Sequence, residues 1–456
     1  MFINARTKFL MRKDEVMFLF KLGKTKIPHL KNTSGNEPVR ISAPDTVKIL
    51  MSQHIGKPAI LEVAVGDKVY VGTKIGSADG VVSANVHSSV SGTVKNIEDY
   101  QLENGYSTKA VVIESDGEMT PDPAIAPVSV TSKEELVAAA RESGLVGLGG
   151  AGFPTAVKLS PENLDEIDVL LLNGAECEPY ITGDTRTMID RADELRRGVE
   201  LIMGTLGIKE AVIAIEKNKK EAITAMNAAF ATTPAVRIAA LPTKYPQGAE
   251  KVLVYNALKR RVPEGGLPSD VGVIVMNVTT VATLMRYVDT GMPLVEKCIT
   301  VDGPAIKEPK NVIAPIGMKI GDLIMAAGGY KTDAHKVLYG GPMMGISVYS
   351  VDSPVLKNTN AIIAFDEKNA ALPESTACIH CGRCVSACPI GLNPTAFAKA
   401  LKLENKSDMA ARLEEENINL CMQCGCCSYV CPAKRPLAES NKLAKDALRA
   451  IKANEN

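Results

Sequence analysis

The chain has 456 residues, enough for roughly two to four domains of about 100–200 residues each. Its 52 basic and 52 acidic side chains balance, so the composition indicates neither nucleic acid nor an anionic membrane as a partner. Aromatic residues make up 4% of the chain and Trp is absent, which argues against the stacking platforms of proteins that bind single-stranded nucleic acid.

The apolar runs are too short for membrane spans, which need ~20 residues. Val271–Val275 and Ala361–Phe365 are typical of buried strands instead. Near the N-terminus, Val16–Phe20 is shorter than the apolar core of a signal peptide, and no A-x-A cleavage site follows it. We therefore expect a soluble chain located in the cytoplasm, with no direct membrane span.

The N-terminal quarter of the chain is typical of small β-structure. After a loop-like stretch over Pro28–Pro44, residues 59–98 contain short apolar segments separated by glycines, a pattern that predicts strands joined by tight turns. The Pro-rich segment Thr120–Pro127 predicts a linker to the next domain.

Residues 131–290 alternate between strand and helix patterns, which predicts an α/β core with a largely parallel sheet. Thr131 or Ser132 caps the first helix, and Glu134 or Glu135 completes a capping box. A helix is also expected to begin near Pro246. The other expected elements are strands at Val169–Leu172, Ala211–Ile215, Val236–Leu241 and Val271–Met276, and helices at Asp193–Leu206, Lys219–Phe230 and Val281–Tyr287.

Residues 293–350 return to short strands with Gly and Pro turns. A second linker is expected over about Pro354–Ser375, before a cysteine-rich segment and a polar helical tail from about Leu437.

Nine of the eleven cysteines lie between Cys378 and Cys431, and clustered thiols in a large chain of this kind indicate metal rather than disulfides. They form two runs of C-x2-C-x2-C-x3-C-P, in which the fourth cysteine typically ligates the other cluster. We therefore expect two 4Fe–4S clusters. One is expected to be held by Cys378, Cys381, Cys384 and Cys431, and the other by Cys421, Cys424, Cys427 and Cys388.

A pair of zinc sites is the alternative for these cysteines, but zinc motifs usually carry two separated Cys pairs. Cys426 breaks the repeated spacing and is interpreted as a spare thiol. His380 lies inside the first run and is interpreted as a packed or supporting residue rather than a ligand.

The segment Gly147–Pro154 contains G-x-G-x-x-G, but a helix precedes it and Phe-Pro follows it, so the Rossmann interpretation is not favoured. A packing turn remains the structural alternative. The glycines nevertheless allow the backbone to approach a phosphate-bearing ligand closely. Polar residues at Asn173–Pro179 follow a buried strand, which is where α/β sheets bind their ligands.

These two segments, GLGGAGFPTAVK at Gly147–Lys158 and NGAECEP at Asn173–Pro179, resemble the flavin-binding NADH subunit of respiratory complex I. Gly248–Glu250 and Asn277–Thr280 fit the same pattern. The resemblance implies an FMN and NADH site that includes Gly147 in its glycine loop. It assigns FMN binding to Gly149, Gly150, Gly152, Lys158, Asn173, Glu178, Asn277 and Thr280, and it places Phe153, Glu176 and Glu250 on the nicotinamide side.

Four N-terminal motifs extend the resemblance to nearly the whole chain. These motifs, in the order in which they occur, resemble the C subunit of the Rnf-type ion-translocating ferredoxin:NAD oxidoreductase. Two of them also resemble a lipoyl or biotinyl barrel. The motifs are His29–Thr33, Gln53–Ala59, Val65–Gly72 and His87–Val94.

That resemblance implies a multidomain α/β protein with four parts. They are an N-terminal barrel-sandwich-like β domain at 1–118, an α/β flavin-binding domain at 128–292, a β-grasp-like soluble-ligand-binding domain at 293–352 and a helical two-cluster ferredoxin-like domain at 370–456.

The implied function is electron transfer between NAD(H), FMN and the two clusters, in a peripheral subunit on the cytoplasmic side of a membrane-bound complex. The FMN is expected to be non-covalent, because no Ser-Gly-Ala-Thr flavinylation motif occurs. One alternative is a soluble flavin iron–sulfur cobalamin reductase. The other is a ferredoxin-like adaptor without flavin, whose α/β domain only binds partners.

Overall fold

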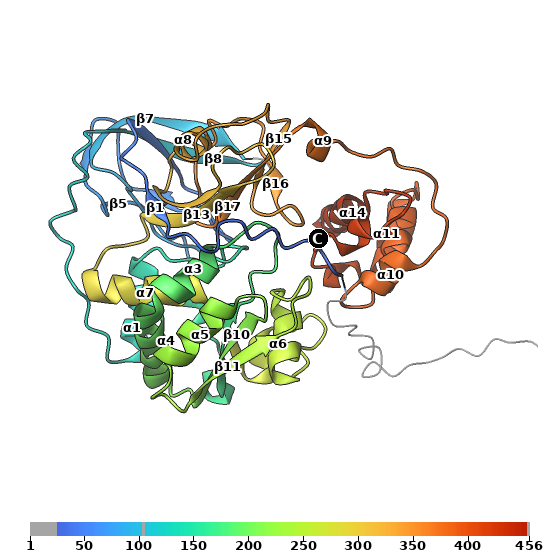
Figure 1. The fold of residues 1–456 in the computed structure, drawn as a ribbon, viewed down its shortest axis with the longest axis horizontal. Helices are drawn as coiled ribbons and strands as arrows, with labels where there is room; N and C mark the ends of the chain where they lie inside the picture. The colour runs from blue at the N-terminus through green and yellow to red at the C-terminus, as the bar shows by residue number, and fades with distance from the viewer. Residues whose placement is uncertain (1–24, 103–104, 454–456) are drawn as a thin grey trace, which may run out of the picture. The chain divides into compact units, whose positions relative to one another are not determined.

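The computed structural model describes residues 25–102 and 105–453, and the apolar stretch Val16–Phe20 lies outside these residues. The described chain divides into two compact units (Figure 1). The larger unit comprises Ile27–Thr243 and Gln247–Leu372, and the smaller comprises 25–26, Lys244–Pro246 and 373–453.

A four-stranded parallel sheet forms the centre of the α/β domain, with strand order β11-β10-β9-β12. Its strands are β9 (Val169–Gly174), β10 (Glu210–Glu216), β11 (Val236–Leu241) and β12 (Val273–Asn277). The chain adds β10 and β11 on one side of β9 and then returns to place β12 on the other side. The order therefore reverses between β9 and β12, which is the switch point where open α/β sheets bind ligands.

Helices cover both faces of this sheet, because alternate residues of each strand are buried on opposite sides. Leu170 and Leu172 of β9 pack against one group of helices, whereas Val169 and Leu171 pack against α6 (Glu250–Leu258). The first group comprises α1 (Lys133–Glu142), α4 (Ala192–Leu206), α5 (Lys220–Ala229) and α7 (Val278–Thr290) (Figure 1).

The N-terminal domain contains two antiparallel sheets around a core of small aliphatic residues that includes Val47, Ile75 and Ile113. One sheet has the order β2 (Thr46–Leu50), β8 (Ser107–Ser115), β7 (Gly92–Gln101) and β4 (Lys68–Val69). The other has the order β3 (Ile60–Leu61), β5 (Lys74–Ser77) and β6 (Val86–His87).

A six-stranded mixed sheet forms the third part of the larger unit and corrects two expectations. The segment expected to be a linker, Pro354–Ser375, contains strand β17 (Ala361–Phe365), which confirms the expectation of a buried strand at these residues. This strand pairs with β13 (Glu296–Asp302) and β15 (Lys336–Tyr339) inside the sheet. The stretch expected to be a loop, Pro28–Pro44, contains β1, which extends the sheet beside β14. The sheet order is β1 (Val39–Arg40), β14 (Lys310–Pro315), β13 (Glu296–Asp302), β17 (Ala361–Phe365), β15 (Lys336–Tyr339) and β16 (Ile346–Ser347).

The smaller unit holds the cysteine runs on a set of helices packed around Phe397, Leu413 and Leu448. Its helices are α10 (Arg383–Ala387), α11 (Pro394–Ala400), α12 (Lys406–Glu415), α13 (Cys426–Tyr429) and α14 (Leu437–Ala453). The polar tail expected from Leu437 is therefore helix α14. Within residues 25–102 and 105–453, no helix combines the length and apolar character that crossing a bilayer requires.

The α/β elements expected from the sequence are all present, with ends that differ by a few residues. Ser132 and Glu135 form the capping box of α1, as expected. Helix α7 begins at Val278, before the expected start at Val281, because the Asn277 side chain caps its N-terminus. The remaining short helices are α2 (Thr155–Lys158), α3 (Gly183–Asp190), α8 (Ile320–Ala326) and α9 (Glu367–Ala370), with 3-10 turns at Leu164–Glu166, Pro268–Val271 and Ile418–Leu420.

The close approach of α4 and α7 yields a stability prediction. A methyl group added at Gly198 of α4 would lie 2.9 Å from the carbonyl oxygen of Val281 on α7, so Gly198→Ala should destabilise the fold by about 1–3 kcal/mol. Gly204 is the matched control on the same helix, because a methyl group there meets nothing within 4 Å. Gly204→Ala should gain up to about 1 kcal/mol from helix propensity. Equal urea midpoints for the two variants would contradict this packing.

Candidate functional site

The two asparagines expected at the flavin site lie side by side at the carboxyl edge of the parallel sheet. Asn173 is the residue before the last in β9, Asn277 is the last residue of β12, and the two are register partners across the ladder. The amide of Asn173 donates to the carbonyl of Gly248 (2.9 Å), and its oxygen accepts the N–H of Ala175. Both side chains are thus fixed at the switch point of the sheet.

The glycine loop is held over this edge by its neighbours. The Gly147 N–H donates to the Phe153 carbonyl, which closes the loop, and the Leu148 N–H donates to the hydroxyl of Thr280. A methyl group at Gly149 would lie 2.6 Å from the amide nitrogen of Asn277, whereas one at Gly150 meets nothing within 4 Å. The loop therefore rests against Asn277 at Gly149 and presents exposed backbone at Gly150.

The loop after β9 places the two expected glutamates in different surroundings. Glu176 accepts the N–H of Asp184 (2.6 Å) and the hydroxyl of Thr185 (2.5 Å) at the start of α3, and burial raises the pKa of its carboxyl. The Glu178 carboxylate accepts the N–H groups of Met343 (3.0 Å) and Met344 (2.9 Å). Glu178 thereby joins the flavin domain to the loop before β16.

Lys158 and Glu250 approach the same edge from opposite sides and form an ion pair of 2.8 Å. Lys158 also donates to the carbonyl of Val275 in β12 (3.1 Å). Glu250 is the first residue of α6, where the positive end of the helix dipole stabilises a carboxylate. Phe153 is half-buried at the end of the glycine loop, next to Gly152, whose φ is +69°.

Two ionisable residues that the sequence did not indicate support this edge, the half-buried Asp184 and the buried Lys297. Asp184 accepts from the amide of Asn277 (2.8 Å) and the hydroxyl of Thr279 (2.6 Å), and burial raises its pKa. Lys297 of β13 donates to the carbonyl of Leu148 (2.8 Å), and burial lowers its pKa to about 7. Neither residue belongs to a recognisable sequence motif. Each reaches the site only through the fold, so the sequence alone could not indicate it.

This arrangement fits a flavin mononucleotide. The exposed glycine backbone suits a close approach by a phosphate-bearing chain, and the two asparagine amides supply donors and acceptors for polar edges. Lys158 brings a positive charge to this edge, where it pairs with Glu250. The site therefore has the chemistry that FMN requires, in the place where parallel sheets bind such ligands.

The two cysteine runs form matching loops in the smaller unit. In each loop, the residue before the second cysteine has a left-handed backbone (His380, φ +55°; Gln423, φ +57°), and the glycine after that cysteine starts a short helix (Gly382, φ +69°; Gly425, φ +76°). His380 thus occupies a turning position of the loop. Its place in the repeat supports the interpretation that it is not a ligand.

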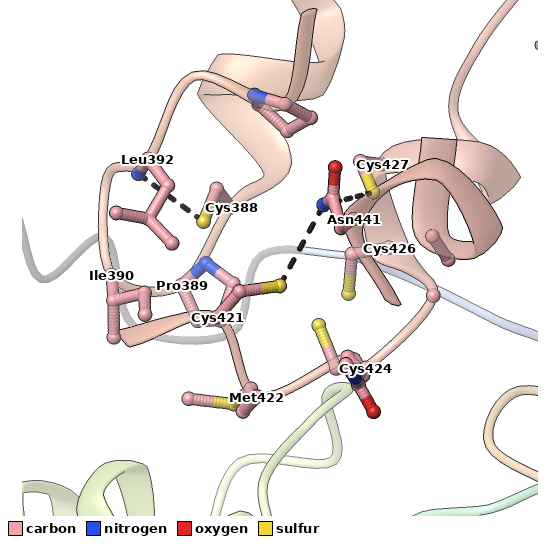
Figure 2. Close-up of a pocket in the computed structure, with 14 residues that line it drawn as sticks. Cys388, Pro389, Ile390, Leu392, Cys421, Met422, Cys424, Cys426, Cys427 and Asn441 are labelled. Carbon is pink, nitrogen blue, oxygen red and sulfur yellow. Dashed lines mark hydrogen bonds between the residues drawn. The ribbon is translucent and has the colours of Figure 1, made fainter. Parts of the chain in front are cut away.

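The structure brings Cys388 of the first run together with Cys421, Cys424 and Cys427 of the second run around one pocket, which Cys426 also lines (Figure 2). N–H groups point at the sulfurs: Leu392 donates to Cys388 (3.3 Å), and the Asn441 amide donates to Cys421 (3.6 Å) and Cys427 (3.9 Å). Donors of this kind tune cluster potentials. Asn441 lies on α14, outside both cysteine motifs, and sequence reasoning missed it.

Burial raises the pKa of the Cys388 thiol to about 11 and that of Cys427 to about 12. Loading a cluster onto these sulfurs must therefore release protons. Among the described residues, no three His, Cys, Asp or Glu side chains are close enough to share one metal ion. A cubane has four thiolates that each bind a different iron, so its ligands stand around it rather than converge on one point.

The other cysteines expected to be ligands lie around the helix of the first run. Cys384 packs with Cys431 and Leu437. Burial raises the pKa of the Cys384 thiol, and the neighbouring thiols of Cys431 and Cys378 raise it further. Cys381 is exposed on the same loop. Cys431 thus lies near Cys384 and Cys378 of the first run, and Cys388 lies near Cys421 and Cys424 of the second run, which supports the crossed assignment.

Cys426 lies at the first turn of α13, where the matching position of the first loop is Arg383 rather than a cysteine. Its thiol is fully buried and forms a hydrogen bond with Cys424, an interaction that raises the pKa of Cys424. Cys427 matches Cys384 in the repeat. The repeat therefore supports Cys427 as the ligand and leaves Cys426 as a neighbour of the cluster.

Comparison with known protein families agrees with each part of this fold. The RnfC barrel sandwich hybrid domain matches residues 20–118, and the Nuo51 FMN-binding domain matches residues 140–286. The SLBB domain matches residues 298–347, and the 4Fe–4S dicluster domain matches residues 374–435. These matches confirm the four-part architecture and the cofactors expected from the sequence, FMN and two 4Fe–4S clusters. The protein is thus of the flavin and iron–sulfur electron-transfer class.

Curated relatives define the family more closely. The chain is 42% identical over 391 residues to the C subunit of a proton-translocating ferredoxin:NAD(+) oxidoreductase complex of Clostridium ljungdahlii, covering 85% of this chain and 84% of the relative. It is 40% identical over 433 residues to the C subunit of the Na(+)-translocating complex of Acetobacterium woodii, covering 94% and 97%. The chain belongs to this family of C subunits of ion-translocating ferredoxin:NAD(+) oxidoreductase complexes.

The crossed arrangement of cysteines predicts how single substitutions affect the clusters. Cys388→Ala should disturb the same cluster as Cys421→Ala, because both thiols line one pocket. Electron paramagnetic resonance of the two reduced variants checks this, and loss of different clusters would contradict it. Cys426→Ala is the matched control and should retain both clusters, whereas loss of one cluster would show that Cys426 is a ligand.

Proposed function

We propose that this chain passes electrons between NAD(H), FMN and two 4Fe–4S clusters during ferredoxin:NAD⁺ oxidoreduction. FMN, when bound, exchanges two electrons with a nicotinamide and single electrons with the clusters. The observation that carries the proposal is the pairing of Asn173 and Asn277 beneath an exposed glycine loop, in a chain that also gathers two sets of cluster thiols.

The FMN-binding residues are proposed to be Gly149, Gly150, Gly152, Lys158, Asn173, Glu178, Asn277 and Thr280. Phe153, Glu176 and Glu250 are proposed to lie on the nicotinamide side. The chain's residues act here by binding and orienting the reactants, and the proposal assigns none of them as a general acid, base or nucleophile. Support comes from the convergence of these side chains on the carboxyl edge of β9 and β12.

We also propose that the chain is a peripheral subunit on the cytoplasmic side of a membrane-bound complex. The relatives' names, which describe ion-translocating complexes with several subunits, support this role. A soluble cobalamin reductase is the less favoured function, because the N-terminal domain matches the RnfC barrel and the relatives are complex subunits. Purified protein that reduces a corrinoid with NADH, but does not associate with membrane subunits, would favour the reductase instead.

The open space at Gly150 provides a direct test of the flavin site. Gly150→Leu should leave the fold unchanged, because the side chain meets no protein atom near its Cβ, but it should block approach to the loop backbone. We expect FMN affinity to fall at least about tenfold, or about 1.4 kcal/mol. Gly204→Leu, on an exposed face of α4, is the control. FMN titration with iron analysis measures both, and unchanged FMN affinity in Gly150→Leu would place the flavin elsewhere.

The peripheral role predicts a specific extraction behaviour. In membranes that contain the complete complex, chaotropic salt should release this chain, whereas subunits that span the bilayer should need detergent. Expressed alone, the chain should remain in the soluble fraction. Firm partition of the isolated chain into liposomes would contradict a purely peripheral role and would direct attention to Met1–Phe20, which lies outside the described residues.

A further inference from the structure

The segment before β1 runs along the loop that follows β9. The Tyr180 N–H donates to the His29 carbonyl (3.0 Å), and the hydroxyls of Thr33 and Thr182 are hydrogen-bonded to each other. Between them, the Lys31 ammonium donates to three backbone carbonyls of that loop: those of Glu176 (2.8 Å), Glu178 (2.7 Å) and Ile181 (2.6 Å). One side chain therefore bonds to three points of a single six-residue loop.

This loop needs an external hold. Glu176 (φ +44°) and Tyr180 (φ +69°) both have left-handed backbones, which residues other than glycine rarely adopt. Three carbonyls that face one point cannot all be satisfied by neighbouring backbone N–H groups. An ammonium has three N–H donors and matches three such acceptors. Lys31 thus stabilises a backbone shape that the loop would not favour by itself.

The charged surroundings of Lys31 explain why Lys31, and not the nearby Lys219, bonds to the three loop carbonyls. Glu176, Glu216, Lys219 and Cys177 face its ammonium, and burial lowers the pKa of Lys31 to about 8. Lys219 is paired with Glu216 (3.0 Å) and reaches the Glu176 carbonyl only at 3.3 Å. The nearby lysine therefore neutralises Glu216, while Lys31 directs its donors to the loop carbonyls.

We propose that Lys31 is a positioning residue of the flavin site: its ammonium holds the Glu176–Ile181 loop, which follows Asn173 in the chain, in its observed shape. In this shape the Glu176 carboxylate bonds to the start of α3 and the Glu178 carboxylate bonds to the backbone at Met343 and Met344. This inference rests on the proposed FMN site and adds to it a residue from a segment outside the flavin domain. Lys31 acts through the loop backbone and needs no contact with the flavin itself.

The proposal has a pH signature that differs from that of a purely stabilising residue. A neutral amine has two N–H donors, so one of the three carbonyls loses its partner as pH rises through about 8, and FMN affinity should fall. Global stability should behave in the opposite way. Between the folded pKa of about 8 and the unfolded value of 10.5, the unfolded chain binds more protons, so the contribution of Lys31 to stability rises with pH.

The test compares the full-length native protein with Lys31→Met and Lys31→Gln, using FMN titration from about pH 6.5 to about pH 9.5. At the lower pH, FMN should bind to Lys31→Met at least about tenfold more weakly than to the native chain. The decline in affinity across pH 8 should be present in the native chain and absent from both variants.

Arg260→Met is the matched control. Arg260 also donates to a backbone carbonyl, that of Val271 (2.9 Å), and pairs with Asp168, but at the amino edge of the same sheet. Its loss should lower the unfolding midpoint and leave both FMN affinity and its pH profile unchanged.

The outcomes separate this inference from the proposed function. A native chain that binds no FMN would overturn the flavin site and this inference with it. If the native chain binds FMN and Lys31→Met binds it with the same affinity and the same pH profile, only the role of Lys31 is overturned. If Lys31→Met does not fold, Lys31→Gln and the native pH profile decide, and native affinity that stays constant across pH 8 overturns the inference.

Discussion

The site depends on the parallel ladder between β9 and β12. Its register pairs Asn173 with Asn277 and sets both at the edge where the strand order reverses. A shift of one residue would turn each asparagine toward the opposite face of the sheet. The glycine loop then takes its position from this edge, because Gly149 rests on Asn277 and Leu148 bonds to Thr280.

The other parts of the larger unit hold this edge in place. Lys297 reaches the glycine loop from β13, and Glu178 bonds to the backbone at Met343 and Met344. The SLBB-type sheet thus does more than follow the flavin domain in the chain, because its residues fix two of the loops around the proposed cofactor. The cysteine loops of the smaller unit share a different feature, a left-handed turn repeated at His380 and Gln423.

Much of this organisation was predictable because it depends on local patterns. Strand and helix periodicity located β9 to β12. The repeated cysteine spacing led to the crossed assignment of Cys388 and Cys431, which stays a prediction that the positions of these thiols support. The apolar run Ala361–Phe365 indicated the buried strand β17, but the linker expected over Pro354–Ser375 hid its place in the sheet, because strand pairing depends on partners distant in the chain. Contacts of Asp184, Lys297 and Asn441 were likewise hidden, because each depends on residues distant in the chain.

The central claim is that electrons move between NADH and the clusters only through flavin bound at this edge. The most direct measurement adds NADH anaerobically to the purified, cluster-loaded full chain, with FMN bound or removed, and follows cluster reduction by electron paramagnetic resonance. The account predicts reduced clusters when FMN is bound and oxidised clusters when it is absent, with a strong chemical reductant still reducing both samples. Clusters that NADH reduces equally well in the flavin-free chain would contradict it.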